Sequence, residues 1–187
     1  MRQLIDFLPW RLRSMFVRRY FGRHNVIMEG LPAIIGMLPK IENKGVLRMA
    51  ANCMFRSFRL RQHFTVRKDA TLEIGDGAFF NDGVNLCATL EIRVGRHAKI
   101  GDQTYIYDSD FHQVAPDAPV RRAPVSIGNN VWIGANSMIL AGASIGDNSV
   151  IAAGSIVVGA IAANCLAAGA PAKVVRALAI PEGWVRS

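Results

Sequence analysis

The sequence predicts an all-β protein, a parallel β-helix in which short coils are stacked one on the next. The first observation is a ladder of aliphatic residues at a constant step of six, and the second is a Gly or Asn three residues after most of them. The ladder positions are Ile127, Ile133, Ile139, Ile145, Ile151 and Val157. A strand repeats every two residues and an α-helix every 3.6, so a step of six indicates a short strand, a corner and another short strand.

The residues between the ladder positions agree with this architecture. Glycine and asparagine tolerate the positive φ that a tight corner requires. Hydrophobic residues make up 51% of the chain but aromatic residues only 8%, as a narrow interior needs. Three faces would give a triangular coil of about 18 residues. The predicted corners are Asn130, Asn136, Gly142, Asn148 and Gly154.

Residues 8–23 are expected to form a helix in which apolar residues recur at helical spacing among five arginines. We expect this helix to pack across an end or side of the β-helix, or to lie on an anionic membrane surface, and the two are compatible. The apolar residues are Leu8, Leu12, Met15, Phe16 and Tyr20.

The chain is expected to divide near residue 65. Residues 1–65 would form the basic helix and irregular first coils, because Gly and Pro interrupt them repeatedly. Residues 66–187 would form the regular β-helix, ending in a cap that contains a short C-terminal helix. An earlier ladder through Ile100 and Ile106 leads to His112, and an excursion with three prolines follows at 113–124.

The net charge of +8 is concentrated at the N-terminal end. Residues 1–70 contain fourteen Lys/Arg and four Asp/Glu, a net +10. This excess is either solvated surface or an attraction to an anionic partner, such as a membrane face or a phosphorylated glycan. No recognition helix or aromatic–basic motif indicates nucleic acid.

The same sequence bears on where the protein works. No apolar run reaches the ~18 residues of a membrane span, and the start lacks a continuous apolar signal core. Three cysteines without metal-ligand spacing suit reduced thiols. We therefore expect a cytoplasmic protein without a metal, with the inner face of the membrane as a potential location.

The stretches Ile127–Gly134, Ile145–Ile151 and Ala168–Lys173 closely resemble those of the hexapeptide-repeat O-acetyltransferases. The maltose, galactoside and nodulation-factor acetyltransferases and their cell-surface polysaccharide relatives are the most similar group. The resemblance is dense over residues 71–176. It implies a left-handed β-helix, a homotrimer with active sites between subunits, and transfer of an acetyl group from acetyl-CoA to a hydroxyl of a saccharide, polysaccharide precursor or glycolipid.

His112 is the candidate general base. Imidazole titrates near neutrality, so it can accept the hydroxyl proton and later return it. Asp108 and Asp110 could fix its tautomer as in a triad, although a surface histidine beside acidic groups is the alternative. The resemblance implies that Asn81 faces the histidine and stabilises the transition state, unless it is another corner asparagine. Asp82, with Asp108, is a candidate contact to the acceptor.

The donor site follows from the resemblance. Trp132 would pack against the pantetheine arm or against a neighbouring subunit, and the backbone of Ala135 and Ala153 would meet the pantetheine or the thioester. The remaining donor contacts would come from Val158, Gly159, Lys173 and Arg176, of which the last two would pair with phosphates. Where relatives carry Thr-Lys, this chain has Val158-Gly159, which weakens the expected phosphate contact.

Three alternatives remain at the level of sequence. An amino-sugar N-acetyltransferase would use the same base. A γ-type carbonic anhydrase would need three histidine ligands, and the chain has no closely spaced pair to supply them. A non-catalytic β-helix scaffold or binding subunit would be indifferent to loss of His112.

Overall fold

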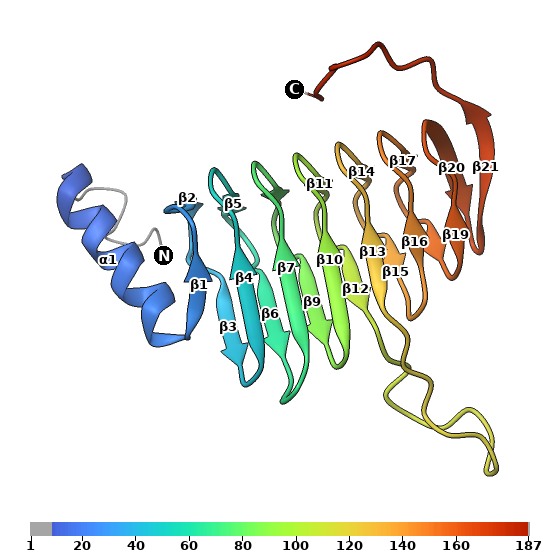
Figure 1. Cartoon of the computed structure of the whole chain (residues 1–187), viewed down its shortest axis with the longest axis horizontal. Helices are drawn as coiled ribbons and strands as arrows, with labels where there is room; N and C mark the ends of the chain where they lie inside the picture. Colours follow the sequence, from blue (N-terminus) through green and yellow to red (C-terminus); the bar gives the residue numbers. More distant parts are fainter. Residues whose placement is uncertain (1–8, 187) are drawn as a thin grey trace.

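Three sheets, one on each face of a triangular coil, contain the strands of the described residues, and all of their strand pairs are parallel except the last pair of one sheet (Figure 1). The computed structural model describes residues 9–186. We name the sheets A, B and C in the order in which the chain visits them, and the edges between them the AB, BC and CA corners. Sheet C is crossed six times, so the chain makes about six turns.

Sheet A contains β1 (Val26–Met28), β4 (Val46–Met49), β7 (Thr71–Ile74), β10 (Glu91–Val94), β13 (Val125–Ile127), β16 (Ser144–Ile145) and β19 (Ala160–Ile161). Sheet B contains β2 (Ala33–Gly36), β5 (Met54–Ser57), β8 (Phe79–Phe80), β11 (Lys99–Ile100), β14 (Trp132–Ile133), β17 (Val150–Ile151), β20 (Cys165–Gly169) and β21 (Ala172–Ala177). Sheet C contains β3 (Lys40–Asn43), β6 (His63–Val66), β9 (Asn85–Ala88), β12 (Tyr105–Tyr107), β15 (Met138–Ile139) and β18 (Ile156–Val157).

The hexad ladder is confirmed. All six of its aliphatic side chains point inward and are at most 3% exposed. All five predicted corner residues have positive φ, from 55° at Asn130 to 79° at Gly142. Each side chain stacks on its equivalent one coil away, as Ile127 does on Ile145.

The first coils are regular in backbone although their sequence is not. Strands β1 to β6 belong to the same three sheets as the later strands, and β6 runs across residues 65 and 66. Phe55, Phe64 and Phe80 fill this wider end, with ring centroids 5.3 to 5.5 Å apart. The aromatic residues are therefore concentrated where the coils are longest.

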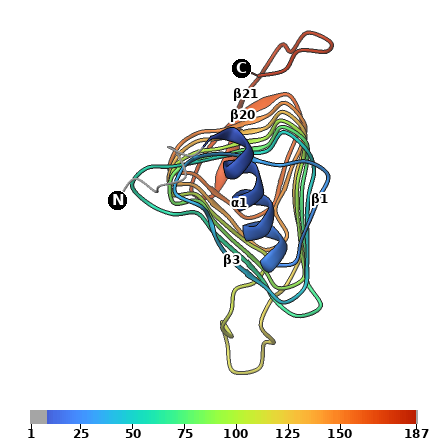
Figure 2. The ribbon, with the colours of Figure 1, turned by 90° about the vertical axis from the view of Figure 1, so that its left-hand side faces the viewer.

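A single helix, α1 (Trp10–Arg23), covers the N-terminal end of the stack in the described part of the chain (Figure 2). Val17 and Phe21 are buried against the first coil, and the Tyr20 hydroxyl donates to the carbonyl of Pro39. The predicted packing across an end is confirmed, but the apolar residues expected to make it are mostly the wrong ones. Leu12, Met15 and Phe16 are exposed, and Leu8 lies outside the described residues.

The predicted C-terminal helix is wrong, because the segment forms β21, which pairs antiparallel with β20. The open edge of sheet B supplies backbone partners there, and the β-branched Val174 and Val175 favour a strand. Residues 178–186 then fold back along the AB corner (Figure 1). They are held by hydrogen bonds from Leu178 N–H to the Asn164 carbonyl and from Arg186 N–H to Asn130 Oδ1, both 2.8 Å.

No helix among residues 9–186 is both long enough and apolar enough to span a membrane.

Candidate active site

Asn81, Ala135, Ala153 and Lys173 lie along one edge of the stack, the BC corner. The register places Phe80 beside Ile100, Ile100 beside Ile133 and Ile133 beside Ile151. The residues that follow form one row of Asn81, Gly101, Gly134 and Ala152, and Ala135 and Ala153 come directly after the last two. Lys173 on β21 extends this row, because it lies opposite Ala168. Four of the predicted site residues thus lie along the same corner of the stack.

Along this corner the backbones of neighbouring coils approach closely, and two backbone N–H groups have no acceptor among the described residues. A Cβ at Gly101 would lie 2.6 Å from the Ala135 nitrogen, and one at Gly134 would lie 2.5 Å from the Ala153 nitrogen, so only glycine fits at either position. Neither the Ala135 N–H nor the Ala153 N–H donates to another group among residues 9–186. Oriented N–H groups of this kind can stabilise a developing oxyanion.

Asn81 is held in one orientation by Arg56, which donates from Nε to the amide oxygen at 2.9 Å. The buried Gln62 donates from Nε2 to the Asn81 carbonyl at 3.1 Å and to the Arg56 carbonyl at 2.8 Å. Because its amide oxygen is occupied, Asn81 presents its NH₂ group as the free end of the side chain. Sequence reasoning missed Arg56 and Gln62, since neither lies near Asn81 along the chain and the longer first coils, which place Arg56 beside Asn81, do not keep the step of six.

The neighbouring Asp82 is 7% exposed, and its carboxylate supports the backbone. One oxygen accepts the N–H groups of Phe58 and Arg59 at 2.6 and 3.1 Å. These bonds hold the corner that joins β5 to β6 one coil earlier. The contacts of Asp82 are therefore structural, and they differ from the acceptor contact expected from the sequence.

His112 lies at the CA corner, where the chain leaves β12 and begins the excursion. The imidazole is exposed, and the backbone N–H of His112 donates to the backbone carbonyl of Asp110 at 2.8 Å. The base of the excursion is closed by a bond from Asp110 N–H to the Arg121 carbonyl and by a bridge between Ser109 and Arg122. His112 therefore stands on a short closed stem that projects from the stack (Figure 1).

An aromatic cluster accompanies this stem on the outer side of sheet C. The rings of Tyr105 and Tyr107 have centroids 5.8 Å apart, and those of Tyr107 and Phe111 are 5.4 Å apart. Phe111, directly before His112, has φ of 61°. Burial is the main cause that raises the pKa of Tyr107, with Tyr105 second. The last ring of this cluster thus belongs to the residue that directly precedes His112.

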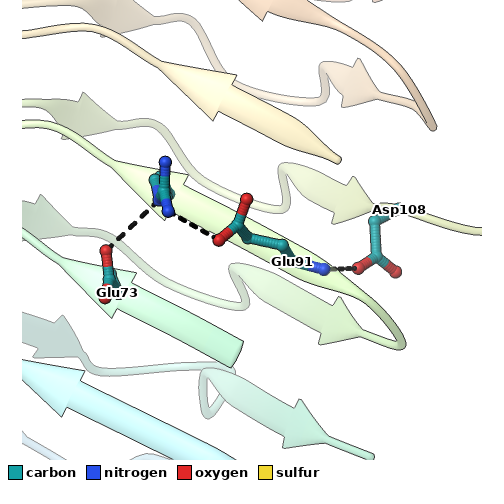
Figure 3. Close-up of polar contacts among 4 residues, drawn as sticks. Glu73, Glu91 and Asp108 are labelled. Atoms are coloured by element: carbon teal, nitrogen blue, oxygen red, sulfur yellow. Dashed lines mark hydrogen bonds and ion pairs between the residues drawn. The ribbon is translucent and has the colours of Figure 1, made fainter. Parts of the chain in front are cut away.

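Asp108 is fully buried and does not face the imidazole as expected. Its two oxygens accept the N–H groups of Thr89, Leu90 and Glu91, each at 2.7 Å, and the Thr89 hydroxyl at 2.9 Å. Figure 3 shows the bond from Glu91 to Asp108, with the ion pairs from Arg93 to Glu91 and Glu73 at 2.8 and 3.3 Å beside it. Asp108 therefore fastens the preceding coil.

Val158 and Gly159 also lie at the CA corner, because they follow β18 of sheet C. The Val158 side chain is exposed, and the Gly159 carbonyl accepts the Ser144 N–H at 3.2 Å. They are separated from Ala135 and Ala153 by the width of sheet C. The same width separates His112 from Asn81, since His112 follows β12 and Asn81 precedes its partner β9. One chain by itself does not bring these two groups together.

Trp132 lies on the outer face of sheet B, between the BC row and the folded-back tail. It is 46% exposed, and the guanidinium of Arg186 lies 6.0 Å from its ring centroid and 4.8 Å from that of Trp184. Arg176 continues this face on β21. A shallow hollow beside Trp132 is lined by Arg56, Phe79, Asn81, Lys99 and Arg186. Among its lining residues the charged groups are all cations, which suits an anionic or polar ligand.

Among residues 9–186 there is no group of three or more His, Cys, Asp or Glu side chains that could hold a metal ion.

Comparisons with known proteins agree with this architecture. Residues 124–159 match the bacterial transferase hexapeptide (six repeats) family. Galactoside O-acetyltransferase of Escherichia coli is 36% identical over 121 residues, which are 65% of this chain and 51% of that protein. The chain therefore spans about half the length of that relative. A putative acetyltransferase of Saccharomyces cerevisiae is 33% identical over 144 residues, covering 74% of this chain and 73% of that protein.

The chain belongs to the hexapeptide-repeat acetyltransferase family.

A crystal structure extends the likeness to the whole fold. A hexapeptide-repeat acetyltransferase of Vibrio cholerae, in complex with acetyl-CoA, matches 92% of this chain and 80% of its own with a TM-score of 0.62 and 25% identity. The coils before residue 66, which the sequence marked only weakly, fall within a match of this extent. Membership of the hexapeptide-repeat acetyltransferases therefore concerns the first coils as well as the regular ladder.

Proposed function

We propose that this protein is an acetyl-CoA-dependent O-acetyltransferase that modifies a hydroxyl of a saccharide, a polysaccharide precursor or a glycolipid. The likeness to the Vibrio cholerae acetyltransferase in complex with acetyl-CoA carries this proposal, because it extends over 92% of the chain. The sugar acceptor is supported by the similarity to galactoside O-acetyltransferase. The exposed imidazole and the bare N–H groups of the BC corner provide the chemistry.

The reaction needs one base and one set of donors. His112 removes the proton of the acceptor hydroxyl while its oxygen attacks the thioester carbonyl carbon. The Ala135 or Ala153 N–H, with the NH₂ group of Asn81, stabilises the tetrahedral oxyanion. The C–S bond then breaks, the proton passes from His112 to the sulfur, and coenzyme A leaves as the thiol. Asp110 accompanies His112 on the stem as the group that orients the imidazole.

The active form is a homotrimer in which His112 of one chain faces Asn81 of the next. Within one chain these residues lie at opposite edges of sheet C. The donor contacts divide in the same way, since Val158 and Gly159 share the corner of His112 while Ala135, Ala153 and Lys173 share that of Asn81. An assembly that apposes the CA corner of one chain to the BC corner of another would complete both sites. Trp132 and Arg176 would then line the donor groove.

The test is release of free thiol from acetyl-CoA in the presence of hydroxylated glycans. His112→Ala should lower the rate by ~10²–10⁴-fold. His97→Asn is a matched control, because Asn also tolerates the positive φ found at His97. Full turnover in the His112→Ala protein would reject the base, and absence of turnover with every acceptor would favour a scaffold. The protein thiols are buried, and burial raises the pKa of Cys53 to about 12, so they add little background.

The acceptor itself requires a screen, with products identified by mass spectrometry. Amino sugars belong in this screen because an amine would use the same base. An acetyl group found on nitrogen would change the acceptor class and leave the assignment of His112 intact. Acyl-CoAs of increasing chain length, tested in parallel, would determine whether acetyl is preferred.

A further inference from the structure

Helix α1 has apolar residues on both of its sides. Val17 and Phe21 face the coils and are at most 3% exposed. On the opposite side Leu12, Met15 and Phe16 are 51%, 67% and 43% exposed. Residues three and four apart lie next to each other on a helix, so these three side chains form one continuous surface. Isolated exposed apolar residues are common, but a cluster on one outward helical face indicates a binding surface.

The same outward face is strongly basic. The segment Trp10–Arg23 contains five arginines and no Asp or Glu. Arg13 is turned inward and donates to the Ile34 carbonyl. Arg18, Arg19 and Arg23 are exposed and form no ion pair with an acidic side chain among the described residues. Arg19 and Arg23 lie two turns beyond Leu12 and Phe16, so they continue the apolar cluster on the same side.

Among residues 9–186, no other segment covers this face of α1. The helix lies across the triangular end of the stack, and its outward face points away from the coils (Figure 2). The excursion at 113–124 and the folded-back tail are nearer the other end of the molecule (Figure 1). The part of the chain that the structure describes therefore leaves the outward face of the helix open to a flat surface.

We propose that the outward face of α1 binds the surface of an anionic lipid bilayer. Leu12, Met15 and Phe16 would enter the boundary between headgroups and acyl chains, and the arginines would pair with lipid phosphates. A second copy of the chain is disfavoured as occupant, since two such faces would bring arginines together. A polyanion such as RNA would engage the arginines but would have no use for the apolar cluster. This inference does not depend on the proposed function.

The test is flotation of the full chain with vesicles of phosphatidylglycerol and phosphatidylcholine, compared with phosphatidylcholine alone. The wild-type protein should bind the anionic vesicles and lose binding at high salt. Both a Leu12→Ser/Met15→Ser/Phe16→Ser variant and an Arg18→Gln/Arg19→Gln/Arg23→Gln variant should bind at least ~10-fold more weakly. Phe58→Ser/Leu60→Ser removes two equally exposed apolar side chains from the BC corner and should bind as wild type.

Several results would overturn the inference. Absence of binding to anionic vesicles would do so. Unchanged binding of the serine variant, together with loss of binding by the glutamine variant, would also do so, because it would indicate a general polyanion site. Dissociation of an oligomer by the serine substitutions, with no vesicle binding by wild type, would make the face a protein interface. If the triple serine variant melts at a lower temperature than wild type, the single variant Met15→Ser replaces it, because Met15 is the most exposed of the three residues. It should also bind anionic vesicles more weakly than wild type.

Discussion

Asp108 shows how strongly a single buried carboxylate can be used by the backbone. It is fully buried and accepts four hydrogen bonds, three of them from consecutive N–H groups one coil earlier. Such bonds to an ionised group are stronger than neutral ones, and each donor would be left without a partner if the carboxylate were removed. Its proximity to His112 in sequence suggested chemistry, but its bonds are those of a structural brace.

Asp108→Ala is therefore expected to destabilise the protein by roughly 3 kcal/mol, and Asp108→Asn by less, because the amide keeps one acceptor oxygen. Chemical denaturation of both variants measures this difference. Asp110→Asn, on the same stem but without a side-chain bond to a neighbouring coil, should leave stability unchanged. A normally stable Asp108→Ala protein with lost turnover would contradict the structural role and favour contact with the substrate.

The coils of the stack differ in how well their sequence predicts them. Between Ile127 and Ile145 one coil takes 18 residues, so the step of six is visible. Between Leu47 and Leu72 one coil takes 25 residues, because its strands are four residues long and its turns are longer. Without a fixed step the inward positions of the first coils could not be recognised. The outward side of α1 was misassigned for another reason, since it also carries apolar residues at helical spacing, Leu12, Met15 and Phe16.

The corner asparagines should contribute through their backbone conformation. Asn136 has φ of 57° and an exposed side chain. Asn136→Ala should cost about 1 kcal/mol because a β-carbon disfavours this region, while Asn136→Gly should stay within about 0.5 kcal/mol of wild type. Urea denaturation of the two variants provides the comparison. Equal stability of the alanine and glycine variants would mean that the corner does not depend on positive φ.

At the scale of the whole molecule, the candidate site is divided between two edges of the prism. The sequence predicted His112 and Asn81 as participants, but it could not show that they are on different corners. That separation depends on how many strands lie between them and on which sheet each strand joins. Gln62 and Arg186 were missed because their contacts span 19 and 56 residues and follow no repeat. Arg56 was missed because the 25-residue length of its coil, which places it beside Asn81, does not show in the step of six.

A divided site predicts complementation between two inactive chains. His112→Ala and Asn81→Ala chains should each be deficient alone, but co-expression should restore about a quarter of wild-type turnover in randomly mixed trimers, because a quarter of the interfaces pair two intact groups. Turnover of the co-expressed mixture, compared with separately purified chains mixed after folding, measures this effect. If co-expression restores nothing, each chain contains its own site and the inter-subunit arrangement is excluded.

Positions along the BC corner are separated by a constant distance, the spacing between neighbouring coils. Neighbouring coils are about 4.8 Å apart, so the row from Asn81 to Lys173, five steps long, covers roughly 24 Å. Removing or adding one coil would change the distance between the two ends of this row by one coil spacing, and the residues at each end would stay the same. The length of a ligand that contacts both ends of this row can therefore change only in steps of one coil spacing.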